Sequence, residues 1–78
     1  MFNTYVKKLE VNSQEVIDIV RLLGYFGLKF DVGDEYFKVN EDDPQRKEWF
    51  RQFTIYGTRK QLTEFSKAQR FIVCYHMH

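Results

Sequence analysis

The sequence of 78 residues has little of what many small domains depend on. A single cysteine, Cys74, excludes an internal disulfide and any site that needs several thiolates, and it fits a reducing compartment. One proline and four glycines exclude a linker composition. No segment approaches the roughly eighteen apolar residues of a membrane span, and the first residues lack the pattern of a signal peptide. We therefore expect a cytoplasmic protein with no membrane partner.

The sequence also has no marked excess of charge of either sign. Twelve Lys and Arg against eleven Asp and Glu give a formal net charge of +1, which provides neither a polyanionic surface nor a strong cationic field. Aromatic residues, by contrast, make up 18% of the chain, so a few bulky side chains must build the core. We expect one compact domain over residues 1–78, whose partners are recognised by a local patch.

The first quarter of the chain predicts a strand followed by a helix. Residues 2–11 mix β-branched and aromatic residues with charges, and the apolar positions change parity at Lys7 and Lys8, where we expect a bulge. Asn12 is placed to cap a helix, and Glu15 is placed to reach back to it.

The helix after Asn12 has an amphipathic pattern. Its expected buried stripe consists of Val16, Ile17, Val20 and Leu23. Gly24 or Gly27 is expected to end it, because glycine takes the left-handed conformation readily.

The middle of the chain predicts strands on both sides of a polar turn. Apolar residues alternate at Leu28, Phe30 and Val32 and then change parity at Gly33. Either a two-residue hairpin turn or a glycine bulge within one long strand explains that change. Residues 40–45 form a polar turn that contains the only proline.

Residues 47–56 permit two interpretations. As a strand, they turn Trp49, Phe53 and Ile55 inward and Phe50, Gln52, Thr54 and Tyr56 outward. As a helix, they begin after a cap at Asp43. The β-prone end of this segment favours the strand.

The last third predicts a helix and a final strand. Thr58 and Gln61 form a capping box before a helix through Leu62 and Phe65, and residues 71–77 form a dense β-prone run. The order strand, helix, strand, strand, helix, strand predicts an α+β fold of the ferredoxin-like kind: a four-stranded antiparallel sheet with both helices on one face.

Catalytic and metal chemistry has little support in the sequence. Cys74 and His76 would share one face of the final strand, but no third group that orients the imidazole can be identified. His76 and His78 are too few ligands for a structural zinc site, and residues 41–43 lack the spacing of a calcium loop. We therefore expect a protein that is not an enzyme and has no cofactor and no metal.

Two segments resemble the RNA recognition motif. Tyr5–Leu9 is similar to its first-strand box, and residues 50–56 would occupy its third strand. The resemblance implies binding of RNA or single-stranded DNA on the sheet surface. The small residues that the motif has between its stacking aromatics are missing here, and we assign no family.

The open side of the predicted sheet is the candidate binding surface. Its outward residues have the composition of an interface core: Tyr36, Lys38, Phe50, Thr54, Tyr56 and His76. The alternatives are that these side chains are exposed singly, or that the register differs and they belong to the core. This surface predicts docking onto a larger protein, which the chain inhibits or modulates. Binding of RNA or single-stranded DNA is the alternative, and a homodimer through the same face is compatible.

Two further features bear on partners. In length and aromatic content the chain is similar to small accessory proteins of bacteriophages, some of which block host or defence enzymes. Seven basic residues gather in the second half, where a groove that follows phosphates could use them; interspersed glutamates favour a solvated helix face instead. These residues are Arg46, Lys47, Arg51, Arg59, Lys60, Lys67 and Arg70.

Overall fold

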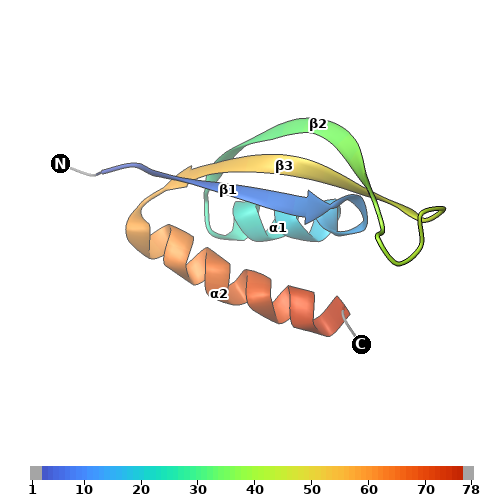
Figure 1. The fold of residues 1–78 in the computed structure, drawn as a ribbon. Coiled ribbons are helices and arrows are strands. Elements are labelled where there is room, and N and C mark those ends of the chain that lie inside the picture. Colours follow the sequence, from blue (N-terminus) through green and yellow to red (C-terminus); the bar gives the residue numbers. More distant parts are fainter. Residues whose placement is uncertain (1–2, 77–78) are drawn as a thin grey trace.

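Three strands form one antiparallel sheet that carries two helices on one face (Figure 1). The structure is a computed structural model that describes residues 3–76, and for residues 72–76 only their place in the last helix. The elements are β1 (Tyr5–Asn12), the 3-10 turn η1 (Ser13–Glu15), α1 (Val16–Tyr25), β2 (Lys29–Val39), β3 (Lys47–Gly57) and α2 (Arg59–His76). The strand order is β1-β3-β2, so β3 is central.

The prediction of a four-stranded ferredoxin-like sheet is wrong, although the α+β class is right. Residues 71–76, expected to form a fourth strand, continue α2 to His76. No glycine or proline lies between Thr58 and that segment, and each residue added to an established helix gains a hydrogen bond. The β-prone residues therefore extend the helix rather than start a new strand.

Strand β1 is regular, so the expected bulge at Lys7 and Lys8 is wrong. Its register against β3 runs without interruption from Tyr5 opposite Gly57 to Asn12 opposite Phe50. Lys7 lies on the helix-covered face and donates a hydrogen bond from Nζ to the Ser66 hydroxyl on α2. A lysine fits there because its long apolar stem reaches across the face to a polar partner.

Asn12 caps the 3-10 turn η1, whereas α1 itself begins at Val16 without a side-chain cap and buries only part of the predicted stripe. The Asn12 side chain accepts a hydrogen bond from the Gln14 N–H at 2.9 Å. Ile19 and Leu23 are buried, whereas Ile17 is 67% exposed. Apolar residues almost surround this helix, so more than one stripe was compatible with the sequence.

Gly27 ends this helical segment. It has a φ of 66° and donates to the Gly24 carbonyl, while Leu28 donates to the Leu23 carbonyl. These two bonds form a Schellman motif, which satisfies carbonyls at the end of the helix.

Strands β2 and β3 form a long hairpin. Residues 29–39 are one strand with an irregular register between Val32 and Glu35, which confirms the glycine-bulge alternative. The strand interpretation of residues 47–56 is confirmed, and the helical one is wrong. Because of the bulge, Phe37 lies on the same face as Phe30.

The core lies between the sheet and the two helices. It consists of Val11, Ile19, Leu23, Leu28, Phe53, Ile55, Leu62 and Phe65. The capping box that starts α2 is confirmed: the Thr58 N–H donates to Gln61 Oε1 at 2.9 Å, and the Gln61 N–H donates to Thr58 Oγ1 at 3.1 Å.

Candidate binding surface

Five of the six predicted surface residues lie together on the face of the sheet opposite the helices. On β3, buried Phe53 and Ile55 point toward the helices, so the even-numbered residues point the other way. Pairing with β2 brings Tyr36 beside Phe50 on that same face. The sheet thus gathers Tyr36, Lys38, Phe50, Thr54 and Tyr56 on one side, which we call the uncovered face.

His76 does not belong to this face. It is the last residue of α2, so its predicted place on a final strand of the sheet is wrong. Cys74 is in the same helix, and the side chains of both residues lie outside the described part of the structure.

Carboxylates hold the tyrosine hydroxyls of the uncovered face. Glu10 accepts hydrogen bonds from the Tyr36 hydroxyl and, at 2.7 Å, from Lys38 Nζ. The Lys38 bond, together with that from Tyr36, lowers the pKa of Glu10, and the bond to Glu10 raises the pKa of Tyr36 to about 12. A bond of 3.0 Å to Asp31 raises the pKa of Tyr56 in the same way. The face therefore combines aromatic rings with a fixed polar network.

The two aromatic residues nearest the hairpin loop are in contact on this face. The ring centroids of Tyr36 and Phe50 are 6.1 Å apart, and Lys38 Nζ lies 5.4 Å from the Phe50 centroid. Aromatic side chains are enriched at the centre of protein interfaces, and Lys38 adds a cation–π contact to this pair.

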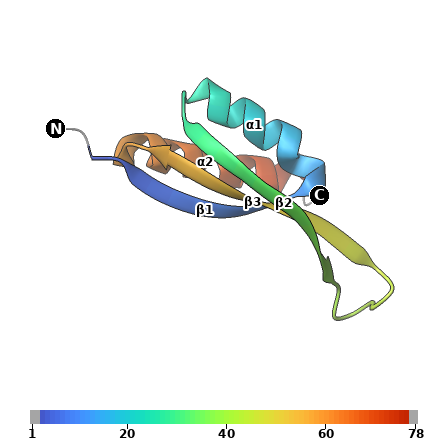
Figure 2. The same ribbon diagram turned by 90° about the horizontal axis from the view of Figure 1, so that it is seen from above.

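A second aromatic pair lies on the opposite face of the same part of the hairpin. The ring centroids of Phe37 and Trp49 are 5.2 Å apart, and Lys47 Nζ lies 4.8 Å from the Phe37 centroid. Phe37, Val39 and Trp49 are 47%, 50% and 45% exposed. Although this face carries both helices elsewhere, the hairpin extends past them and past β1, which ends opposite Phe50 (Figure 2).

We call this extension the hairpin end and define it by Tyr36 and Phe50 on one face and Phe37, Val39 and Trp49 on the other. Sequence reasoning turned Trp49 inward, which is the correct face but not a covered position. The lengths of the strands and the helix indicate that the hairpin end is not covered. Eleven strand residues span roughly 36 Å, whereas a ten-residue helix spans about 15 Å, so α1 cannot cover the whole hairpin.

The basic residues of the second half of the chain do not form one cluster in the structure. Arg51 donates a hydrogen bond to the Gly33 carbonyl at the bulge, and Lys47 lies over Phe37 on the hairpin end. Arg59, Lys67 and Arg70 lie together on α2, along a groove beside β1.

No helix in the described residues is long and apolar enough to span a membrane. Among the same residues, no group of three or more His, Cys, Asp or Glu side chains is arranged to hold a metal ion. No protein family, curated protein or solved structure matches the chain.

Proposed function

We propose that this chain is a non-catalytic binding protein that docks onto a larger protein through the uncovered face and the hairpin end, and thereby inhibits or modulates it. The observation that carries the proposal is the hairpin end, where paired aromatic rings lie on both faces: Phe37 and Trp49 are about half exposed, and Tyr36 and Phe50 are partly exposed. Exposed apolar groups of this kind mark interaction sites. A cleft in a partner could enclose both faces at once.

Charge supports a protein rather than a nucleic acid as the partner of this region. Residues 34–48 contain six acidic and three basic residues, a formal charge of −3. A polyanion is repelled by such a segment. An apolar protein cleft, by contrast, gains from burying large aromatic side chains, which are enriched at the centres of interfaces.

The test is capture from a nuclease-treated extract of cells that express the chain, with the full-length protein as bait. The bait is compared with a Trp49→Ala/Phe50→Ala variant. Tyr25→Ala is the matched control, because Tyr25 is 83% exposed at the end of α1, away from the hairpin end. A bound protein is then confirmed by a photocrosslinker placed at position 49.

We expect a protein that is retained by the wild type and by Tyr25→Ala, is lost with the double variant and crosslinks from position 49. Circular dichroism must show that the double variant is folded. Equal retention by the folded double variant contradicts the proposal. A wild type that sediments as a dimer while the double variant sediments as a monomer assigns the surface to self-association instead.

A further inference from the structure

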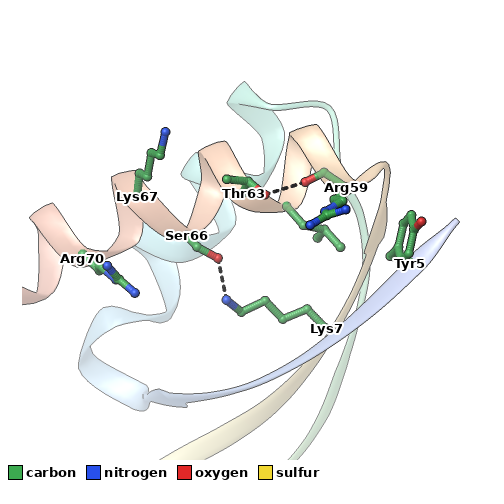
Figure 3. A pocket seen from close by; sticks show the side chains of 8 residues that line it. Tyr5, Lys7, Arg59, Thr63, Ser66, Lys67 and Arg70 are labelled. Atoms are coloured by element: carbon green, nitrogen blue, oxygen red, sulfur yellow. Dashed lines mark hydrogen bonds between the residues drawn. The ribbon is translucent and has the colours of Figure 1, made fainter.

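The groove between the edge strand β1 and α2 is a second candidate site, on the helix-covered side of the sheet (Figure 3). Its volume is about 460 Å³. Four of its eight lining residues are cationic, none is acidic, and Tyr5 and Leu62 add an aromatic and an apolar wall. We propose that this groove binds the backbone of single-stranded nucleic acid.

The cations of the groove have little internal neutralisation. Lys7 is half-buried, and its hydrogen-bond partner is the neutral hydroxyl of Ser66. Within the described part of the chain, the one ion pair that involves a groove cation joins Lys67 to Glu64 at 3.8 Å, and both side chains are largely exposed. Such an exposed pair is weak. An incoming phosphate therefore meets cations whose charge is largely available.

The position of Arg59 strengthens this argument. Arg59 opens α2, and the first turn of this helix contains no acidic residue. A cation at that end is unfavourable for the helix, because the macrodipole already places positive charge there. A bound phosphate would be attracted by both the guanidinium and the helix end.

The shape of the groove suits a single strand. Arg59 and Arg70 lie eleven residues apart on one helix, which is roughly 16 Å, so the groove can face several consecutive phosphates of an extended chain. Tyr5 is 45% exposed at the same end of the groove as Arg59, where a base can stack on its ring (Figure 3). Cations that follow the backbone together with an aromatic platform are the features of sequence-tolerant single-strand binding.

The charge distribution also favours this site over the hairpin end. Residues 59–70 contain four basic residues and one acidic residue, a formal charge of +3, whereas residues 34–48 have a formal charge of −3. A net charge of +1 for the whole chain conceals this separation. A polyanion is therefore directed toward α2 and away from the proposed protein-docking surface.

The test is fluorescence anisotropy with labelled oligothymidylate and oligouridylate over a range of salt concentrations. We expect the wild type to bind with a logarithmic salt slope of about −3, as about four phosphate contacts require. Arg59→Gln/Arg70→Gln should weaken binding by roughly tenfold or more and reduce the slope by about 1.4. The control Arg21→Gln/Arg46→Gln makes the same change in net charge outside the groove and should alter affinity by less than about twofold.

Two more variants separate this site from others. Tyr5→Leu should weaken binding by about fivefold if a base stacks there. Trp49→Ala/Phe50→Ala should bind the oligonucleotides like the wild type, so this proposal and the protein-docking proposal stand or fall separately. Equal losses in both arginine pairs, or a loss in the hairpin variant alone, overturn the groove. Groove-dependent binding to phosphatidylglycerol vesicles without oligonucleotide binding overturns it as well.

Discussion

The two ends of the β2–β3 hairpin have the same alternating pattern but different surroundings. At the end beneath the helices, Phe53 and Ile55 are fully buried. At the other end, Trp49 and Phe37 lie on the same face and remain about half exposed. The comparison shows that alternation identifies the face of a side chain, whereas the length and position of the helices decide whether that face is covered.

The largest expected effect is a loss of stability at the packed end of the hairpin. Phe53→Ala should lower the free energy of unfolding by about 3–5 kcal/mol, because it leaves a cavity in a core that has little room to collapse. Trp49→Ala, four residues earlier on the same face, should cost less than about 1.5 kcal/mol. Urea unfolding followed by circular dichroism measures both. Similar losses in the two variants would contradict the difference between the ends.

Replacing either of two glycines by alanine adds one methyl group and tests how tightly its surroundings are packed. A Cβ at Gly57 would lie 2.3 Å from Leu28 Cδ2 in the packed region, so Gly57→Ala should destabilise the protein by about 1–3 kcal/mol. A Cβ at Gly24 meets nothing within 4 Å, so Gly24→Ala in α1 should stabilise it by about 0.5–1 kcal/mol. Thermal or urea unfolding reports both signs. A stabilised Gly57→Ala variant would refute the close approach of β3 to Leu28.

The start of α2 offers a smaller effect in the packed region. Thr58→Ala removes the acceptor of the Gln61 N–H and should cost about 1 kcal/mol. Thr63→Ala is the matched control, because its hydroxyl donates to the Arg59 carbonyl within the helix, and it should change stability by less than about 0.5 kcal/mol. Chemical unfolding of both variants measures the two losses of stability. Equal losses would show that the Thr58 cap does not stabilise α2.

The smallest effect concerns the uncovered face at alkaline pH. The pKa of Tyr36 is raised to about 12 by its bond to Glu10, so the folded state holds this proton more tightly than the unfolded state. The resulting stabilisation is fully present below pH about 10 and is lost as the pH rises through about 12. The pKa of Glu10 is lowered, so its contribution is present above the unfolded value and is lost as the pH falls through the folded one.

A tyrosinate absorbance titration checks this prediction. The difference between the wild type and Tyr36→Phe isolates one transition at about pH 12. Glu10→Gln removes the charged acceptor and should move that transition back toward 10. An unchanged transition in Glu10→Gln would show that the bond between these two side chains does not set the pKa.

Much of the fold could be predicted from local signals in the sequence. The Asn12 cap, the capping box at Thr58 and the bulge alternative at Gly33 all depend on near neighbours in the chain, and the structure contains all three. The outward set on β3 also followed from alternation alone. The alternating pattern alone therefore places Tyr36 and Phe50 on one face.

The errors have two sources: extension of a helix that is already formed overrides local β propensity, and contacts between residues distant in the sequence select which side chains are buried. Residues 71–76 are β-prone in isolation but continue a helix that is already formed. Ile17 fits an apolar stripe, yet packing against the sheet buries Ile19 in its place, together with the predicted Leu23. The groove beside Arg59 needs β1 at its side, and no pattern within α2 alone specifies that neighbour.

The most direct measurement uses Trp49, the only tryptophan, as a probe of the hairpin end. We predict that acrylamide quenches its fluorescence substantially in the native protein at every protein concentration, though less than in urea because the side chain is 45% exposed, and that a bound protein partner shields it and shifts its emission to the blue. Native emission that is already blue-shifted and protected in dilute, partner-free protein would show that the hairpin end is covered, and the docking surface would be lost.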